Sequence, residues 1–251
     1  MDCFAIAAPG LEELIAAELA DLSIQGTVVP GGVEWSGSES TIALANLWSR
    51  IASRIVVRVG QFRARTFFEL ERHANKIEWA KYVKSGAAVR FRVTCRKSKL
   101  YHSDAVAQRF QEAVARAIGD FTLADAGDED DAADSTSQLF IVRFDRDECT
   151  VSADASGELL HRRGYRQAVA KAPLRETLAA AMLRGAGWDG RTSIVDPMCG
   201  SGTIPIEAAR IARRIPPGLD RDFAFLHWPD ASADRWKALT DRARQQILKS
   251  S

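Results

Sequence analysis

Hydrophobic and polar positions change period several times along the first sixty residues. The predicted elements are a strand over 4–8, a helix over 11–22, strands over 27–30 and 33–36, a helix over 40–53 and a strand over 54–62. The Gly31-Gly32 pair between the middle strands is a hairpin signal. This βαββαβ order predicts a ferredoxin-like domain. Trp48, on the second helix, is expected in its core rather than on a base-stacking surface.

A second α/β pattern follows in residues 63–155. The predicted elements are a strand over 89–95, a helix over 103–118 capped by Ser103, and closing strands over 139–144 and 149–153. Alternation along the first of these strands places Arg90, Arg92 and Thr94 on one face. The acidic stretch 124–137 has few apolar residues and is predicted to form a mobile loop.

A strand, a glycine turn and a helix N-terminus are predicted near the C-terminus. Residues 193–196 are apolar up to Asp196, Gly200 and Gly202 form the turn, and a helix begins at Thr203. Such an arrangement is typical of the nucleotide-binding crevice of an open α/β sheet. Further helices are predicted over 172–183, ended by Gly185 and Gly187, and over 233–248. A core helix and a tight turn without a ligand are the plainer interpretations.

The turn lacks the marks of two commoner phosphate-binding loops. No lysine follows Gly202, as a P-loop requires, and Pro205 stands where a dinucleotide fingerprint has its third glycine. Cys199 is not expected to be a nucleophile, because no histidine lies near it in the sequence. The four cysteines (Cys3, Cys95, Cys149 and Cys199) have no metal-ligand spacing, so no metal site is predicted and a reducing cytoplasm is expected.

The net charge of +1 conceals a segregation of charge along the chain. The net charge is −4 for residues 1–60, +7 for 61–120, −9 for 121–160 and +7 for 161–251. A polyanion is attracted by local basic surface rather than by total charge. We expect phosphate contacts or base stacking from Arg63, Arg65, Arg92, Arg96, Lys97, Lys99, Tyr101, His102, Arg162, Arg163 and Arg166. The alternative is a solvated basic loop.

Three motifs together resemble one family. His161-Arg-Arg-Gly-Tyr-Arg166, Ala172-Pro-Leu-Arg-Glu176 and Asp196-Pro-Met-Cys-Gly-Ser-Gly-Thr203 resemble, in this order, the THUMP-domain class I RNA methyltransferases, in particular those that methylate guanine N2 of large-subunit ribosomal RNA. The resemblance implies an α/β chain with an α+β N-terminal part. Its parts would be a ferredoxin-like domain over 1–62, a THUMP RNA-binding domain over 63–156 and part of a Rossmann-like methyltransferase domain over 157–251.

The resemblance also implies a cofactor and a partner. S-adenosylmethionine (SAM) would be held by Asp196, Pro197, Met198, Cys199, Gly200, Ser201, Gly202 and Thr203, with Ala172, Pro173, Leu174, Arg175 and Glu176 on the other wall. The partner would be RNA, ribosomal or transfer RNA, with no membrane contact.

Two features of such enzymes are absent from the sequence. One is the acidic residue that ends the next strand, and the other is an Asn-Pro-Pro-Tyr/Phe loop; no Asn-Pro dipeptide occurs. We therefore assign no catalytic residue and expect the chain alone to be inactive without its missing catalytic half, in cis or in trans. We also expect poor order or self-association of residues 160–251. The alternatives are a non-enzymatic RNA-binding module and a fragment of a transfer RNA methyltransferase.

Overall fold

The computed structural model describes residues 1–125, 136–165 and 174–249. The strands are β1 (Asp2–Ile6), β2 (Thr27–Val29), β3 (Gly32–Ser36), β4 (Arg54–Arg63), β5 (Ala88–Arg96), β6 (Thr122–Leu123), β7 (Gln138–Asp145) and β8 (Glu148–Asp154). The α-helices are α1 (Glu12–Asp21), α2 (Glu39–Trp48), α3 (Phe67–Ala74), α4 (Ser103–Ile118), α5 (Glu176–Gly185), α6 (Thr203–Ala212) and α7 (Ala233–Gln245), with 3-10 turns at Trp79–Lys81 and Ala224–His227. No helix among the described residues is long and apolar enough to cross a membrane.

The chain divides into two compact units, which are interleaved in sequence. The first unit comprises residues 1–3, 56–158 and 222–231, and the second comprises 4–55, 159–221 and 232–251. The three-domain division predicted from the sequence stays a prediction.

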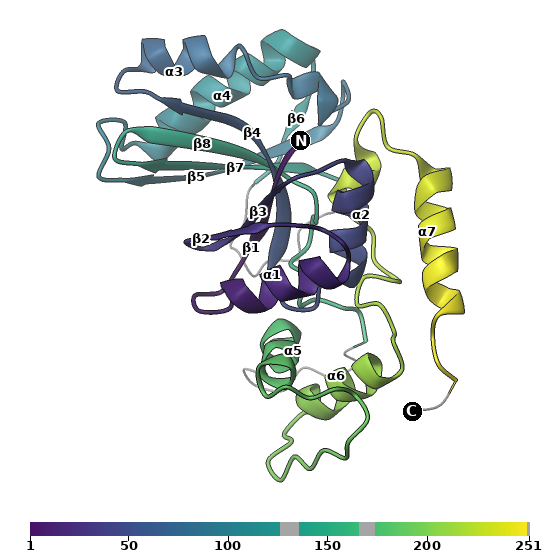
Figure 1. Cartoon of the computed structure of the whole chain (residues 1–251). Helices are drawn as coiled ribbons and strands as arrows, with labels where there is room; N and C mark the ends of the chain where they lie inside the picture. The colour runs from purple at the N-terminus through teal and green to yellow at the C-terminus, as the bar shows by residue number, and fades with distance from the viewer. Residues whose placement is uncertain (126–135, 166–173, 250–251) are drawn as a thin grey trace. The chain divides into compact units, whose positions relative to one another are not determined.

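The predicted βαββαβ pattern is confirmed in the first sixty residues. The elements from β1 to β4 follow it, and β2 pairs antiparallel with β3 across a turn at Pro30 and Gly31, one residue before the predicted Gly31-Gly32 pair (Figure 1). The strand order β2-β3-β1-β4 is that of a ferredoxin-like sheet. Helix α1 buries Ile15 and Leu19, and α2 buries Ile42 and Leu47. Trp48 at the end of α2 is partly exposed.

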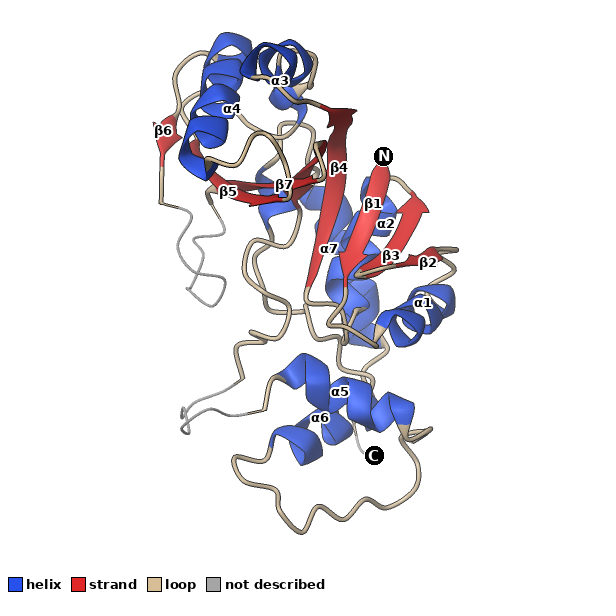
Figure 2. Cartoon of the chain, turned by 90° about the vertical axis from the view of Figure 1, so that its left-hand side faces the viewer, coloured by secondary structure: helices blue, strands red, loops and turns tan. Residues whose placement is uncertain are grey.

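The sheet of the first unit has the order β4-β8-β7-β5-β6. Strand β5 runs parallel to β7 and to the short β6, whereas β8 pairs antiparallel with β4 and β7. Helices α3 and α4 pack against each other beside this sheet (Figure 2). Four aromatic rings fill the core under them, with Trp79 within 6.4 Å of Phe91, Phe110 and Phe140, measured between ring centroids. The predicted strands and helix of this part are confirmed.

Two local features of the first unit differ from the sequence analysis. Helix α3 was not predicted, although Thr66 and Glu69 form a capping box at its start. The N-cap of α4 is His102 rather than Ser103. The prediction of a mobile acidic loop over 124–137 falls mostly outside the described residues.

The predicted strand over 193–196 is wrong. These residues have no strand conformation, and Val195 is 86% exposed. A strand exists only where neighbouring strands accept its backbone hydrogen bonds, and no strand among the described residues of the second unit lies beside this segment. The helices before and after it, α5 and α6, do form and pack against each other. Helix α7 confirms the last predicted helix.

Candidate functional site

The glycine turn before α6 is held by its own backbone. The Asp196 carboxylate accepts a hydrogen bond from the Met198 N–H at 3.1 Å, and the Gly202 N–H donates to the Cys199 carbonyl at 2.7 Å. Gly202 is the N-cap of α6 in the left-handed conformation, with φ +77°. A residue with a Cβ adopts this conformation only at a cost, so glycine suits the position. The turn therefore leads directly into the N-terminus of α6, the arrangement in which a loop can present backbone N–H groups to a ligand.

The turn has room for a ligand at close range. A Cβ placed on Gly200 would meet only the Met198 carbonyl, at 4.0 Å, and one on Gly202 would meet only the Ile206 side chain, at 3.6 Å or more. Pro197, Met198, Cys199 and Ser201 are exposed, as is Gly200. The first turn of a helix has N–H groups without intrahelical partners. The carboxylate, the open glycines and the helix N-terminus are thus chemically suited to the amino-acid end of SAM.

The second predicted wall is described only in part. Ala172 and Pro173 lie outside the described residues. Leu174 is partly exposed, Arg175 is the exposed N-cap of α5, and Glu176 is buried at the start of that helix. Because α5 packs on α6, the two helices that follow the predicted cofactor segments belong to one layer of the second unit. Thr203, which opens α6, is buried, and its Oγ1 lies 3.4 Å from Ser201 Oγ.

A buried carboxylate that the sequence analysis did not single out anchors α6. Glu207 is fully buried and forms ion pairs with Arg163 and, at 3.7 Å, with Arg50. The Tyr165 hydroxyl donates to Glu207 Oε1 at 2.9 Å. The available signal was a single carboxylate in the apolar stretch Ile204 to Ala209, since a buried charge needs partners. The cluster ties the helix after the glycine turn to two distant segments of the same unit.

Electrostatics in this cluster follow from its burial. Desolvation, followed by the neighbouring Arg163 guanidinium, lowers the pKa of Arg50 to about 10. Desolvation also lowers the pKa of Arg163, although Glu207 opposes this effect. Burial, followed by the Glu207 carboxylate, raises the pKa of the Tyr165 phenol. At neutral pH the two guanidiniums remain charged and the phenol neutral, so Glu207 holds two cations and one hydroxyl donor.

Arg163 is a correction to the predicted RNA contacts. Its side chain is fully buried, and its second terminal nitrogen donates to the Arg50 carbonyl at 2.5 Å. Its two polar partners, the Glu207 carboxylate and the Arg50 carbonyl, both lie inside the unit, so this side chain is not on a surface that RNA can touch. Arg162 is partly exposed, and Arg166 lies outside the described residues. The basic loop 162–166 thus serves the fold at one position at least.

The remaining predicted RNA contacts, apart from Arg92 in the middle of β5, gather at one end of β4 and β5 in the first unit. Arg63, Arg65, Arg96, Lys97, Lys99, Tyr101 and His102 are exposed, and Arg92 is partly exposed. The Tyr101 and His102 rings lie 4.1 Å apart between centroids. The acidic β7–β8 turn also reaches this end: Asp147 pairs with Arg65 at 3.3 Å and accepts from the Lys99 N–H at 2.8 Å. Glu148 lies 4.0 Å from Arg63. The acidic turn therefore partly neutralises the two arginines, leaving the 96–102 stretch as the more available basic surface.

Both ends of the chain match models of known protein families. A family model described as the RlmL ferredoxin-like domain matches residues 2–56, and one described as the RMKL-like methyltransferase domain matches residues 163–250. The ribosomal RNA large subunit methyltransferase K/L of Syntrophotalea carbinolica is 36% identical over 249 residues, which are 97% of this chain and 34% of that protein. YpsC of Bacillus subtilis, whose name assigns it to the RNA methyltransferases, is 36% identical over 245 residues, with 97% of this chain and 62% of that protein covered.

A solved structure is also similar over nearly the whole chain. SMU.472, crystallised in complex with SAH and titled as a methyltransferase, is 32% identical with a TM-score of 0.86, covering 99% of this chain and 65% of that one. The chain spans about a third of the K/L protein and under two thirds of the other two. Residues 163–250 therefore match a methyltransferase domain and residues 2–56 match a ferredoxin-like domain, and nearly the whole chain is similar to the K/L methyltransferase and to YpsC.

Proposed function

We propose that this chain is the RNA-binding and cofactor-loop part of a SAM-dependent RNA methyltransferase that acts on guanine N2 of large-subunit ribosomal RNA. The observation that carries the proposal is the turn from Asp196 to Thr203, with two open glycines at the N-terminus of α6. The K/L relatives carry ribosomal RNA in their names, and a structural neighbour was crystallised with SAH, the product that SAM leaves after methyl transfer. A cytoplasmic location accompanies this proposal.

In this proposal the chain's own residues bind and orient SAM, and none of them takes part in a chemical step. SAM supplies the methyl group and its own leaving group when it is bound. The Asp196 carboxylate, whose Oδ1 already accepts from its own loop, would accept from the ammonium of the methionine end. The first-turn N–H groups of α6 would donate to the carboxylate end. We assign no proton transfer to any residue of this chain, and we propose that methyl transfer requires the Asn-Pro-Pro-Tyr/Phe loop that this sequence lacks.

Titration calorimetry of SAM and SAH into the 251-residue chain tests the cofactor assignment. We expect binding that Asp196→Ala weakens at least about tenfold, because one charge-assisted hydrogen bond contributes roughly 1.5–3 kcal/mol. Asp189→Ala is the matched control, since Asp189 likewise accepts from its own loop, from the Arg191 N–H at 2.9 Å, and lies outside the glycine turn. Equal losses in both variants would contradict the assigned role of Asp196.

A non-enzymatic RNA-binding module is the second candidate, favoured by the exposed basic 96–102 stretch of the first unit. Under that reading the chain binds RNA but neither SAM nor SAH. A gel shift with ribosomal RNA fragments and transfer RNA, run beside the calorimetry, separates the two candidates and also separates the two RNA classes.

A further inference from the structure

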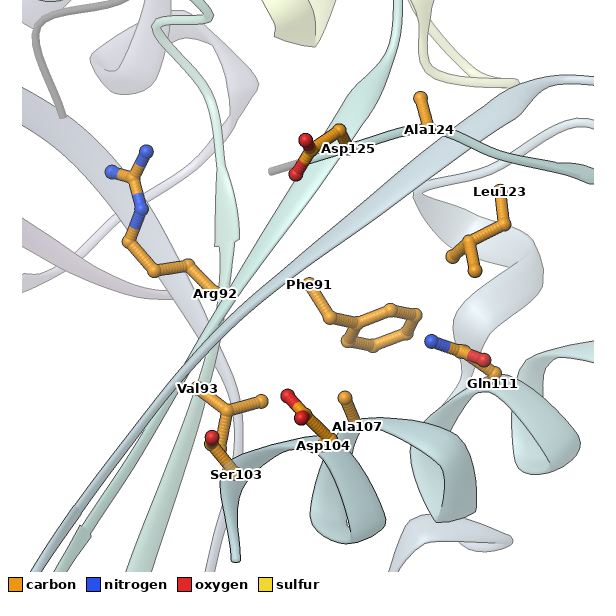
Figure 3. A pocket seen from close by; sticks show the side chains of 10 residues that line it. All are labelled: Phe91, Arg92, Val93, Ser103, Asp104, Ala107, Gln111, Leu123, Ala124 and Asp125. Carbon is orange, nitrogen blue, oxygen red and sulfur yellow. The ribbon is translucent and has the colours of Figure 1, made fainter. Parts of the chain in front are cut away.

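A hollow in the first unit lies beside β5 and has no assigned role. Its volume is about 490 Å³, and its lining comes from β5, the first half of α4 and the residues around the end of β6 (Figure 3). It lies on the strand that continues into the basic 96–102 stretch. The hollow is therefore part of the same element as the proposed RNA surface, but it is chemically different from that surface.

Within the part of the chain that the structure describes, the outer edge of β5 is open at the hollow. Strand β6 pairs with β5 only at Ala88 and Val89, and the Ala124 N–H donates to the Val89 carbonyl at 3.0 Å. Beyond this point no strand among residues 1–125 and 136–165 pairs with that edge. Backbone groups of alternate residues point to the same side of a strand, so those of Phe91 and Val93 face the open edge as those of Val89 do. An unpaired edge offers N–H donors and carbonyl acceptors to a ligand.

The side chains around this edge include an aromatic ring and several polar groups. The Phe91 ring lies beside α4, near Gln111, and Asp104 comes from the first turn of the same helix (Figure 3). Asp125 lies across the hollow, and Arg92 lies on the other side of the strand from Phe91 (Figure 3). The two carboxylates are acceptors only, whereas Gln111 both donates and accepts.

Two carboxylates at the hollow disfavour phosphate and favour a group with N–H donors. Among the parts of RNA, such donors are the exocyclic amino groups of adenine, cytosine and guanine, whereas the pairing edge of uracil has two carbonyl acceptors around one N–H. At about 3.3 Å per residue, Arg96 lies roughly 13 Å along β5 from Arg92. An RNA strand whose phosphates bind the 96–102 stretch therefore needs only a few nucleotides to reach the hollow.

We propose that this hollow receives one unstacked, amino-bearing base of single-stranded RNA, next to the Phe91 ring and the open edge of β5. The inference rests on the proposed RNA-binding function. Asp104 accepts from the amino group, Asp125 adds negative charge across the hollow, and backbone groups on the edge of β5 contact the rest of the base. Phosphates on either side of that base lie toward the basic 96–102 stretch.

Anisotropy titrations of the 251-residue chain with labelled pentacytidylate and pentauridylate test the proposal, since the two bases differ chiefly by the amino group. We expect cytidylate to bind about fivefold to tenfold tighter, the factor for one hydrogen bond of roughly 1 kcal/mol. Asp104→Asn with Asp125→Asn should reduce the preference to within about twofold by the same reasoning. Asp120→Asn with Glu78→Gln removes the same charge from exposed positions outside the hollow and should retain the preference.

A variant that fills the hollow tests the proposal independently of the carboxylates. Ala107→Phe places a ring inside the lining and should abolish the preference, whereas Gln108→Phe, on the exposed adjacent position of α4, should retain it. Circular dichroism of each variant checks the fold. Equal binding of the two oligonucleotides by the unmodified chain, or a preference that survives both Asn substitutions, would overturn the proposed base pocket. The proposed RNA-binding function would still stand. Absence of binding to either oligonucleotide at low salt would overturn the pocket and the RNA-binding function together.

Discussion

At the scale of single residues, the second unit depends on Glu207. This side chain is fully buried and is contacted by Arg50, Arg163 and Tyr165. Arg163 resembled a surface arginine in the sequence because it stands in a basic loop, yet the structure uses it to pair the carboxylate. Residue type and sequence neighbours therefore do not separate an RNA contact from an internal ion pair.

We expect Glu207→Gln to lower the free energy of unfolding by about 3 kcal/mol, because two buried guanidiniums lose their counter-charge. Urea titration followed by circular dichroism measures the change. The control is Glu148→Gln, which breaks an exposed pair with Arg63 at 4.0 Å and should cost less than about 1 kcal/mol. Similar losses in the two variants would mean that the Glu207 cluster does not stabilise the unit.

The four cysteines should differ sharply in reactivity. Cys199 is exposed in the glycine turn, whereas Cys3 and Cys149 are buried. Burial raises the pKa of Cys3 to about 12 and raises the pKa of Cys149 as well, so neither forms thiolate at pH 8. Mass spectrometry after brief alkylation at pH 8 should find Cys199 labelled, and Cys3 and Cys149 labelled only in denaturant.

The same alkylation reports on the cofactor loop. Bound SAH should slow labelling of Cys199 and leave the labelling of Cys95 unchanged, because Cys95 lies on β5 in the first unit. If saturating SAH does not change the rate at Cys199, the glycine turn is not the cofactor loop.

At the scale of elements, local signals predicted most helices and strands. Helix α4 covers the predicted residues 103–118, although His102 is its N-cap, and the β2–β3 hairpin forms within one residue of the predicted turn. The segment 193–196 failed because strand formation depends on neighbours and not on the segment itself. Helices satisfy their own backbone, so α5 and α6 form where the strand between them does not.

Gly202→Ala should destabilise the start of α6. The Gly202 φ of +77° is costly for alanine, by about 1 kcal/mol or more. Gly185→Ala is the matched control: it lies in α5 without a positive φ, and its Cβ would meet only Leu14 Cδ1 at 3.8 Å. We expect a lower melting temperature for Gly202→Ala and an equal or higher one for Gly185→Ala, measured by thermal circular dichroism. An unchanged melting temperature in both variants would show that the left-handed cap is not a constraint.

At the scale of the whole molecule, charge is segregated while the net charge is only +1. The basic residues 61–120 fall within the first unit, and the structure adds the acidic β7–β8 turn next to Arg65. The charge counted along the sequence therefore overstates the available basic surface. Folding brings Asp147 and Glu148, which belong to the acidic segment 121–160, next to Arg65 and Arg63. Lys97 and Lys99 remain exposed and have no ion pair among those described.

RNA affinity should consequently depend on salt through these two lysines. Lys97→Gln with Lys99→Gln should make the slope of log affinity against log salt shallower by about 1.4, since each phosphate contact on a single strand contributes roughly 0.7. Lys76→Gln with Lys84→Gln is the control, because both lysines are exposed elsewhere in the first unit. Anisotropy titrations at several salt concentrations measure the slopes. Equal slopes in the two double variants would place the RNA surface elsewhere.

The sequence by itself determined the ferredoxin-like order of elements, most element boundaries and the motif from Asp196 to Thr203. These depend on local periodicity, turn residues and a fixed string of residue types. All of them can be recognised without knowing which distant segments meet in the fold. Only the tertiary structure decided that Arg163 is internal, that Glu207 is its counter-charge, and that β5 has, among the described residues, an open edge beside a hollow. Those properties depend on which distant segments meet, because burial, pairing and the desolvation of charge exist only after the chain has folded.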